Sequence, residues 1–334
     1  MNQNFDFVIP KNPGAGIPIP VRIEKNVTPA LIMESGEKGA TRFWEFFTAQ
    51  IRNKNTRIAY LTAVHQFFDW CEQHGFTMET ISPIRVAHYI EQHQGSPPTV
   101  KQHLAAIRTL FDWLVTGQVI EFNPASSVRG PKYGTANNIG KTPVLTAKQT
   151  RKLLDSIETD TVLGLRDRAL IGLMVFSFAR VSAAVTMKVK DYFHQGEEGF
   201  FRFHEKGGKF NKVPAHYTAQ VYLDEYRETA GIVEDKKGPL FRSSKSSRSP
   251  NRLSREAMTR HTAIKMVKRR AATAGCPQIT CHSFRGTGIT AYLKGGGTIE
   301  NAAAIAGHVS TRTTQLYNRA REEISGEEIA RIVI

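Results

Sequence analysis

Apolar residues recur every three or four positions through much of the first third of the chain, which is the period of an amphipathic helix. One such segment begins at Asn55, a residue type favoured at helix N-caps, and ends at Gly75. Its apolar stripe comprises Ile58, Leu61, Val64, Phe68 and Cys71. The pattern therefore predicts a long helix with one buried face.

Two further segments carry the same period. Ser82 followed by Pro83 is typical of an N-cap with proline in the first turn, and the next apolar stripe ends at Gly117. That stripe comprises Val100, Leu104, Ile107, Leu110, Phe111 and Leu114. Together with the aromatic-rich segment 40–51, these helices predict a small all-helical domain over residues 39–121.

Two segments lack any apolar period. Residues 1–38 are rich in Pro, Gly and Asn and are expected to form a flexible leader, and residues 122–143 have the composition of a linker. A new start signal follows, because Thr146 and Gln149 have the spacing of a capping box. We therefore expect a second domain over residues 144–334.

The second domain mixes helical and strand patterns. Phe201 and Phe203 alternate with polar residues before a Gly-Gly turn, which predicts a β-hairpin with a basic tip. A basic helix is predicted from an N-cap at Ser254 to Gly275. Its expected inward face comprises Ala257, His261, Ile264, Val267, Ala271 and Ala274. The fold class is thus α+β: mainly α with a small β-sheet.

The charge balance points to a polyanionic partner. Lys plus Arg number 45 against 30 Asp plus Glu, giving a formal net charge of +15. Nucleic acid is the first candidate partner, an anionic membrane surface is the second, and a charge that serves solubility alone is the third reading. Residues 242–270 are especially basic, with Glu256 as their one acid. This favours a phosphate contact over a merely solvated face. The candidate DNA-binding residues are Lys209, Lys212, Arg242, Lys245, Arg248, Arg252, Arg260, Lys268, Arg269 and Arg270.

The cysteines and the apolar segments restrict the cellular compartment and the cofactors we expect. The three cysteines are too few for a disulfide framework. Cys276 and Cys281 adjoin His282 and suggest zinc, but a fourth ligand at finger-like spacing is missing from the sequence, so we expect neither metal nor cofactor. The N-terminus does not read as a secretory signal, and apolar runs fall short of the roughly 20 residues that span a bilayer. We expect a cytoplasmic, nucleoid-associated protein without a membrane partner.

Six residues along the second domain have the chemistry to cut and rejoin a phosphodiester. In chain order they are Arg180, Lys206, His282, Arg285, His308 and Tyr317. Arginine forks bind phosphate oxygens, histidines donate to them or move a proton, and a lysine can protonate a leaving alkoxide. A tyrosine among cations becomes a usable nucleophile, and its phosphate ester conserves the bond energy for re-ligation. Without these companions, Tyr317 would be read as a packing residue beside a buried face of Thr313, Leu316 and Ala320.

The order and spacing of these motifs resemble the tyrosine recombinase (phage integrase) family. The match includes His282-Ser-Phe-Arg285, a Gly-His pair at 307–308, a Thr-Thr pair at 313–314 and a tyrosine nine residues after His308. The resemblance implies a helical core-binding domain and a catalytic domain that close as a C-shaped clamp on DNA. It also implies that Tyr317 is the nucleophile of a 3′-phosphotyrosyl intermediate.

The resemblance assigns the other roles too. The two arginines and two histidines would bind the scissile phosphate, and a hairpin lysine would be the general acid. Lys206 is preferred over Lys209 and Lys212 because it precedes the Gly-Gly turn, although the choice stays open. A homotetramer would assemble through the C-terminal tail on a double-stranded site with inverted arms.

Several departures from the family pattern matter. The usual Thr-Gly-x-Arg is Ser177-Phe178-Ala179-Arg180, the usual acid three residues after Arg180 is Ala183, and Gly286 stands where a second histidine often follows. The expected function is a recombinase that integrates, excises or resolves a mobile element. Because of these departures, two alternatives stay open. One is a topoisomerase with the same chemistry. The other is an inactive DNA-binding protein on the same fold.

Overall fold

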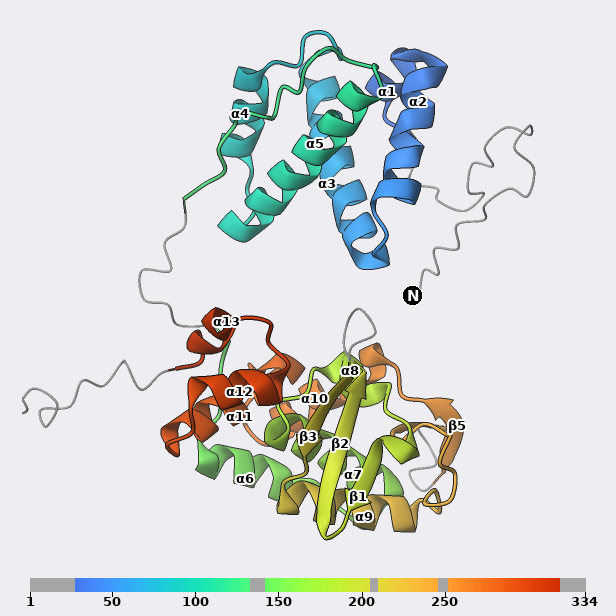
Figure 1. Cartoon of the computed structure of the whole chain (residues 1–334), viewed down its shortest axis with the longest axis vertical. Coiled ribbons are helices and arrows are strands. Elements are labelled where there is room, and N and C mark those ends of the chain that lie inside the picture. Colours follow the sequence, from blue (N-terminus) through green and yellow to red (C-terminus); the bar gives the residue numbers. More distant parts are fainter. Residues whose placement is uncertain (1–27, 133–141, 205–209, 246–251, 319–334) are drawn as a thin grey trace, which may run out of the picture. The chain divides into compact units, whose positions relative to one another are not determined.

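The computed structural model describes residues 28–132, 142–204, 210–245 and 252–318. The chain divides into two units, residues 1–134 and 135–334, which we describe separately. Figure 1 shows helices throughout the first unit and helices with short strands in the second. The predicted fold class, mainly α with a small β-sheet, is confirmed.

The N-terminal unit is built from helices around an aromatic core. They are α1 (Ala30–Glu34), α2 (Gly36–Glu45) with a π-helical turn at Phe46–Gln50, α3 (Lys54–Gln73), α4 (Pro83–Gln92) and α5 (Pro97–Thr116). Helices α3 and α5 pack against each other through Phe67, Phe68 and Phe111, whose rings are almost completely buried. The predicted stripe of α5 is buried along its whole length, so the apolar period located this face correctly.

Four details of this unit differ from the sequence predictions. Helix α1 lies inside the predicted leader because Leu31 and Ile32 are buried in the core. Ala125, in the predicted linker, is buried in the same core. Helix α3 is capped by Asn53 rather than Asn55, since the Asn53 side chain accepts from two backbone amides at 3.1 Å. Ile58, placed on its buried stripe, is 41% exposed.

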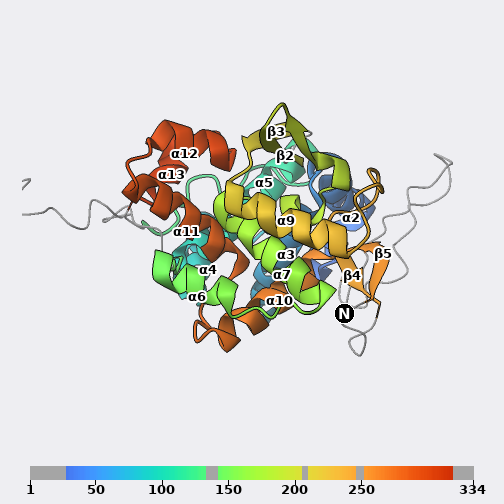
Figure 2. The same ribbon diagram turned by 90° about the horizontal axis from the view of Figure 1, so that it is seen from below.

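The second unit surrounds one apolar helix. Its helices are α6 (Ala147–Asp155), α7 (Val162–Phe176), α8 (Val181–Val185), α9 (Tyr217–Thr229), α10 (Arg260–Thr273), α11 (Cys281–Lys294), α12 (Ile299–Ala306) and α13 (Thr311–Gln315). Helix α7 is buried over almost all of its length and packs against α9, α10 and α11, as Figure 2 lets the reader follow. The predicted capping box opens α6, with the Thr146 and Gln149 side chains satisfying each other's backbone amides.

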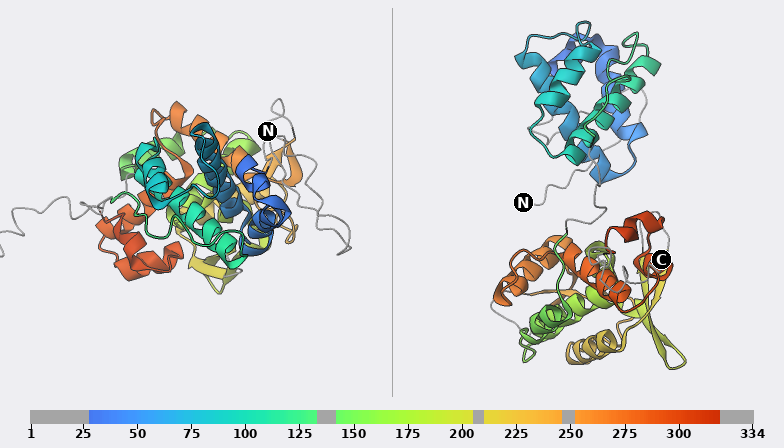
Figure 3. Two further views of the ribbon diagram at one scale, coloured as in Figure 1. Left: turned by 90° about the horizontal axis from the view of Figure 1, so that it is seen from above. Right: turned by 90° about the vertical axis from the view of Figure 1, so that its left-hand side faces the viewer.

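Two small antiparallel sheets complete the unit. Strands β1 (Tyr192–Gln195), β2 (Glu198–His204) and β3 (Phe210–Pro214) form a meander in which Phe201 pairs with Val213. The predicted hairpin is therefore confirmed, while its tip, residues 205–209, lies outside the described residues. Helix α12 packs beside β3, and Figure 3 shows the two elements together.

The second sheet corrects a prediction. Strand β5 (Leu253–Ala257) pairs with β4 (Arg242–Ser244), so the helix predicted from Ser254 starts later, with Thr259 as its N-cap. The Thr259 hydroxyl accepts from the backbone amide of Thr262 at 3.0 Å. Ala257 and His261 are exposed, whereas Val267, Ala271 and Ala274 are buried as predicted. Cross-strand pairing overrode the helical period at these first residues.

Candidate active site

Five of the six predicted catalytic residues lie in the described part of the second unit. Arg180 is the N-cap residue of α8, His282 and Arg285 are on α11, His308 follows α12, and Tyr317 follows α13. Three helix ends and one helix face thus bring together residues up to 137 positions apart, from 180 to 317. Lys206 lies outside the described residues.

A left-handed turn aims His308 at the helix that precedes Tyr317. Gly307 ends α12 with a φ of +61°, a conformation that glycine adopts without steric cost. The backbone amide of His308 then donates to Ala303 at 2.9 Å. Its ring atom Nδ1 lies 2.8 Å from the Thr314 hydroxyl. The Gly-His motif therefore works as a helix cap that fixes the direction of an imidazole.

Tyr317 is docked among the catalytic residues. Its side chain is 6% exposed, and its hydroxyl lies 2.8 Å from His282 Nε2. The ring is nearly parallel to that of His308, at an interplanar angle of 8°. The backbone carbonyl of Tyr317 accepts a hydrogen bond from the Thr290 hydroxyl at 3.2 Å. A Cβ at Gly286 would stand 3.2 Å from the Tyr317 ring, so the missing side chain at 286 leaves room for this position.

The buried face near Tyr317 differs from the prediction. Thr314 is fully buried and Tyr317 nearly so, whereas Thr313 is exposed and Leu316 half-buried. The reason is that α13 ends at Gln315, so the residues after it do not follow the helical period. Ala320 lies outside the described residues.

Two backbone carbonyls hold the second arginine. Arg285 is 2% exposed, and its guanidinium donates to the carbonyls of Phe178 and Ala306, the latter at 2.6 Å. Ala183, where the family pattern has an acid, is 5% exposed and belongs to the apolar core. These two acceptors are neutral, so they orient the guanidinium without offsetting its charge.

Burial and the two arginines set the protonation of the cluster. Desolvation, followed by the charges of Arg285 and Arg180, lowers the pKa of His308 to about 4. The same causes in the same order lower the pKa of His282. Desolvation raises the pKa of Tyr317, while the arginines oppose that rise. At neutral pH both imidazoles are therefore uncharged, and the phenol keeps its proton until a base accepts it.

Some predicted DNA contacts are engaged within the protein. Arg242 is buried and ion-paired with Asp235, so its guanidinium is engaged within the fold. Arg270 is paired with the buried Asp167, as is the more exposed Arg269. The Lys212 ammonium lies 3.9 Å over the Phe200 ring and donates to Gln195.

Other predicted contacts are exposed. Lys245 and Arg252 face each other at the end of the β4–β5 ribbon, where the Lys245 amide donates to the Arg252 carbonyl at 3.0 Å. Both side chains are exposed, as are Arg260 and Lys268 on α10. Lys209 and Arg248 lie outside the described residues.

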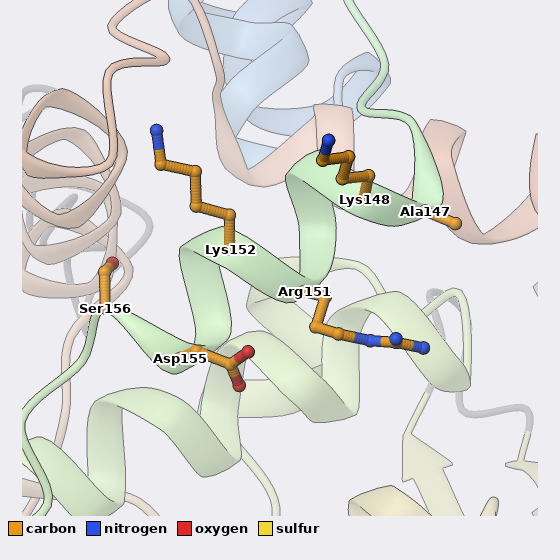
Figure 4. Close-up of a pocket in the computed structure, with 6 residues that line it drawn as sticks. All are labelled: Ala147, Lys148, Arg151, Lys152, Asp155 and Ser156. Carbon is orange, nitrogen blue, oxygen red and sulfur yellow. The ribbon is translucent and has the colours of Figure 1, made fainter.

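A basic depression along α6 was missed by the sequence reasoning. It has a volume of about 650 Å³ and is lined by Ala147, Lys148, Arg151, Lys152, Asp155 and Ser156. Figure 4 shows Lys148 and Lys152 extending to the same side of the helix. The i, i+4 spacing of these two lysines was the available signal. None of the lining residues belongs to the Tyr317 cluster.

The described residues offer neither a metal-binding cluster nor a membrane-spanning helix. Within residues 28–132, 142–204, 210–245 and 252–318, His, Cys, Asp and Glu side chains do not gather into a group that could hold a metal ion. Across the same residues, none of the helices has the length and apolar character required to cross a bilayer.

Comparisons with known proteins agree with the geometry. The model of the phage integrase family matches residues 143–323, and that of its N-terminal SAM-like domain matches residues 40–118. Tyrosine recombinase XerD of Listeria monocytogenes is 28% identical over 272 residues, covering 79% of this chain and 87% of the relative. Tyrosine recombinase XerC of Chlamydia trachomatis is 28% identical over 247 residues, covering 72% of this chain and 73% of the relative.

Solved structures share the fold. A XerH site-specific recombinase in a post-cleavage complex with a palindromic difH substrate has a TM-score of 0.66 at 20% identity, with 92% of this chain and 97% of that chain covered. A lambda integrase dimer bound to a COC′ core site has a TM-score of 0.63 at 18% identity, with 85% and 80% covered. Since the family model matches more than half of its residues, this chain belongs to the phage integrase family.

Proposed function

We propose that this protein is a site-specific tyrosine recombinase that cuts and rejoins DNA strands through a 3′-phosphotyrosyl intermediate. The observation that carries the proposal is the 2.8 Å contact between the Tyr317 hydroxyl and His282 Nε2, in a cluster that also holds His308 and Arg285. A nucleophile, a proton acceptor and cations for the phosphate are therefore close together. The reaction uses neither ATP nor a metal ion.

In the proposed cleavage step, the scissile phosphorus exchanges its bond to a 5′ oxygen for a bond to the Tyr317 oxygen. His282, uncharged because its pKa is lowered, accepts the phenolic proton as the Tyr317 oxygen attacks the scissile phosphorus. The guanidinium groups of Arg180 and Arg285 offset the charge that develops on the phosphate oxygens. The bond from phosphorus to the 5′ oxygen breaks, and the leaving oxygen takes a proton from the general acid. Attack by a 5′-hydroxyl on the phosphotyrosine reverses these events and rejoins a strand.

We assign the general acid to Lys206. The position of Lys212 supports this choice, because its ammonium is engaged by Gln195 and the Phe200 ring. Lys206 follows β2, and β3, the partner strand of β2, is tied to the site by the Asn211 amide, which donates to the Ile305 carbonyl at 3.0 Å. Lys206→Ala should therefore slow cleavage of ordinary DNA far more than cleavage of DNA with a better leaving group.

A nicked suicide substrate tests the central claim. Wild-type protein is expected to become covalently attached to the 3′ end of the cut strand, and Tyr317→Phe should form no adduct because the attacking oxygen is gone. The matched control is Tyr292→Phe, a partly buried phenol packed in the same small cluster, which should still form it. An adduct formed by Tyr317→Phe would disprove the proposed nucleophile.

The same substrates separate the alternatives. The apolar surroundings of Ala183 are the observation that favours an inactive DNA-binding protein, which would footprint on DNA and never form the adduct. A topoisomerase would form the adduct but relax plasmids without sequence preference. A recombinase gives a synapsed, site-specific product from two matching duplexes.

We further propose that the protein acts as a homotetramer on double-stranded DNA with inverted arms and serves a mobile element or a resolution system. A lambda integrase tetramer bound to a Holliday junction shares the fold, with a TM-score of 0.61. Residues 322–334, which lie outside the described part of the chain, are proposed to dock on a neighbouring subunit. Their removal should abolish synapsis while DNA affinity stays within about twofold. Normal synapsis by the truncated protein would reject this role.

A further inference from the structure

Phe178 has an unusual backbone conformation next to the active site. Its φ is +55°, and among the described residues it shares a positive φ with one other non-glycine residue, Gln118 at +54°. A residue with a Cβ in this region costs about 1–2 kcal/mol relative to the right-handed conformation. Such strain persists where the surrounding structure enforces it, and it often accompanies function.

The carbonyl of Phe178 has a catalytic partner. It accepts a hydrogen bond from Nη1 of Arg285, whose guanidinium is 2% exposed and reaches the Ala306 carbonyl with Nη2. The backbone turn at residue 178 decides where this carbonyl points, because φ and ψ rotate the peptide plane. The direction of the carbonyl therefore fixes one of the two observed anchors of the Arg285 fork.

The side chain of Phe178 holds that turn in place. The ring is 5% exposed and packs in a cluster with Ile289, Ala302, Ala306 and Tyr317. It also lies so close to α11 that a Cβ at Gly288 would stand 2.6 Å from it. The same residue thus contacts the helix that carries Arg285 and the cluster that holds the nucleophile.

We propose that Phe178 is a positioning residue that orients Arg285 toward the scissile phosphate through its backbone carbonyl, with its buried ring enforcing the strained turn. This inference rests on the proposed DNA cleavage and deepens it. The neutral carbonyl directs the guanidinium by a hydrogen bond and does not itself offset the positive charge.

Two substitutions separate the backbone role from simple packing. Phe178→Ala removes the ring but keeps the Cβ, so the strained turn relaxes and the carbonyl swings away from Arg285. Phe178→Gly removes more of the side chain, yet glycine accepts a positive φ without cost and can keep the carbonyl in place. We therefore expect Phe178→Gly to cleave about tenfold faster than Phe178→Ala. A packing role alone predicts that the glycine variant is equal or slower.

The readout is the rate of covalent-adduct formation in a single turnover at saturating DNA. The rate is measured on two substrates, one with a phosphate and one with an uncharged methylphosphonate at the scissile position, and the ratio of the two rates is compared between variants. Loss of folded protein lowers both rates equally and leaves their ratio unchanged. Misalignment of Arg285 lowers the preference for the charged phosphate, since that preference depends on the guanidinium. We expect the ratio to fall about tenfold in Phe178→Ala and to recover in Phe178→Gly.

Gln118 supplies the matched control. Gln118→Ala and Gln118→Gly change a backbone of the same φ in the N-terminal unit and should leave the ratio at its wild-type value. A wild-type ratio in Phe178→Ala, or a glycine variant no better than the alanine variant, would overturn the positioning role. Absence of any adduct from the wild-type protein would instead contradict the proposed function itself.

Discussion

At the scale of single residues, backbone groups hold the side chains around Tyr317: two carbonyls anchor Arg285, and the helix end at Gly307 directs His308. Tyr317, His282 and His308 were predicted from motif order, and the structure brings them into contact. The anchoring of Arg285 by two carbonyls could not be predicted, because backbone acceptors leave no trace in side-chain patterns. Phe178 stands where the family pattern usually has glycine. The backbone strain that this residue carries could not be predicted from the sequence, because it follows from the φ of +55° in the structure.

The lowered histidine pKa values predict how the stability of the DNA-free protein depends on pH. In the folded protein the pKa of His308 is about 4, against the ordinary histidine value of 6.5 that applies to the unfolded chain. As the pH falls below 6.5, the unfolded chain takes up this proton first, so stability is lost between pH 6.5 and about 4. We expect the melting temperature of His308→Gln to fall less steeply over this window than that of the wild type.

Calorimetric scans at half-unit pH steps would measure both curves. The comparison isolates His308 because carboxylates that titrate in the same window are shared by the two proteins. Addition of a short duplex should flatten the wild-type curve, since a bound phosphate favours the protonated imidazole. Parallel curves for wild type and variant without DNA would show that the burial of His308 does not affect stability.

At the scale of elements, the apolar period located most helices, and two of its failures have clear physical reasons. The start of α10 was predicted five residues too early, because the segment 253–257 forms an exposed ribbon with a strand that precedes it in the chain. Helix α1 was missed because five residues are too few to show a period. Pairing and burial between distant segments decided both cases.

An ion cluster that joins elements gives a prediction about stability. Asp167 of α7 is fully buried and binds Arg166 at 2.7 Å and Arg270 of α10 at 2.9 Å, while Arg166 also donates to the Arg242 carbonyl of β4. Asp167→Asn leaves buried guanidinium groups without their counter-charge, which costs about 3 kcal/mol. We expect the melting temperature to fall by roughly 6–12 °C.

The exposed pair of Lys236 and Glu234 is the control for this prediction. The Glu234 side chain is 90% exposed, so Glu234→Gln should change the free energy of unfolding by less than about 1 kcal/mol. Equal effects of the two substitutions would show that burial does not distinguish these ion pairs. Chemical denaturation of both variants at neutral pH provides the comparison.

At the scale of the whole molecule, net charge and motif order suggested DNA, but charge alone did not locate its binding surface. Some cations of the basic segment 242–270 form ion pairs inside the protein. Arg242 pairs with Asp235, and Arg270 pairs with Asp167. The depression on α6 carries a similar density of lysine and arginine in a segment that was not singled out. A linear count of charges cannot tell a cation that is paired within the fold from one that is available to phosphate.

The salt dependence of DNA binding separates these two surfaces. Lys245→Gln with Arg252→Gln, and Lys148→Gln with Lys152→Gln, each remove two positive charges from a net charge of +15. If the β4–β5 ribbon contacts phosphates, the first double variant reduces the slope of log K against log salt by about 2, because each phosphate contact releases about 0.9 counterion. The α6 double variant should keep the wild-type slope, since only close contacts displace condensed ions. Titrations of a fluorescent duplex over several salt concentrations measure both slopes, and an equal reduction in the two variants would mean that binding follows net charge rather than this ribbon.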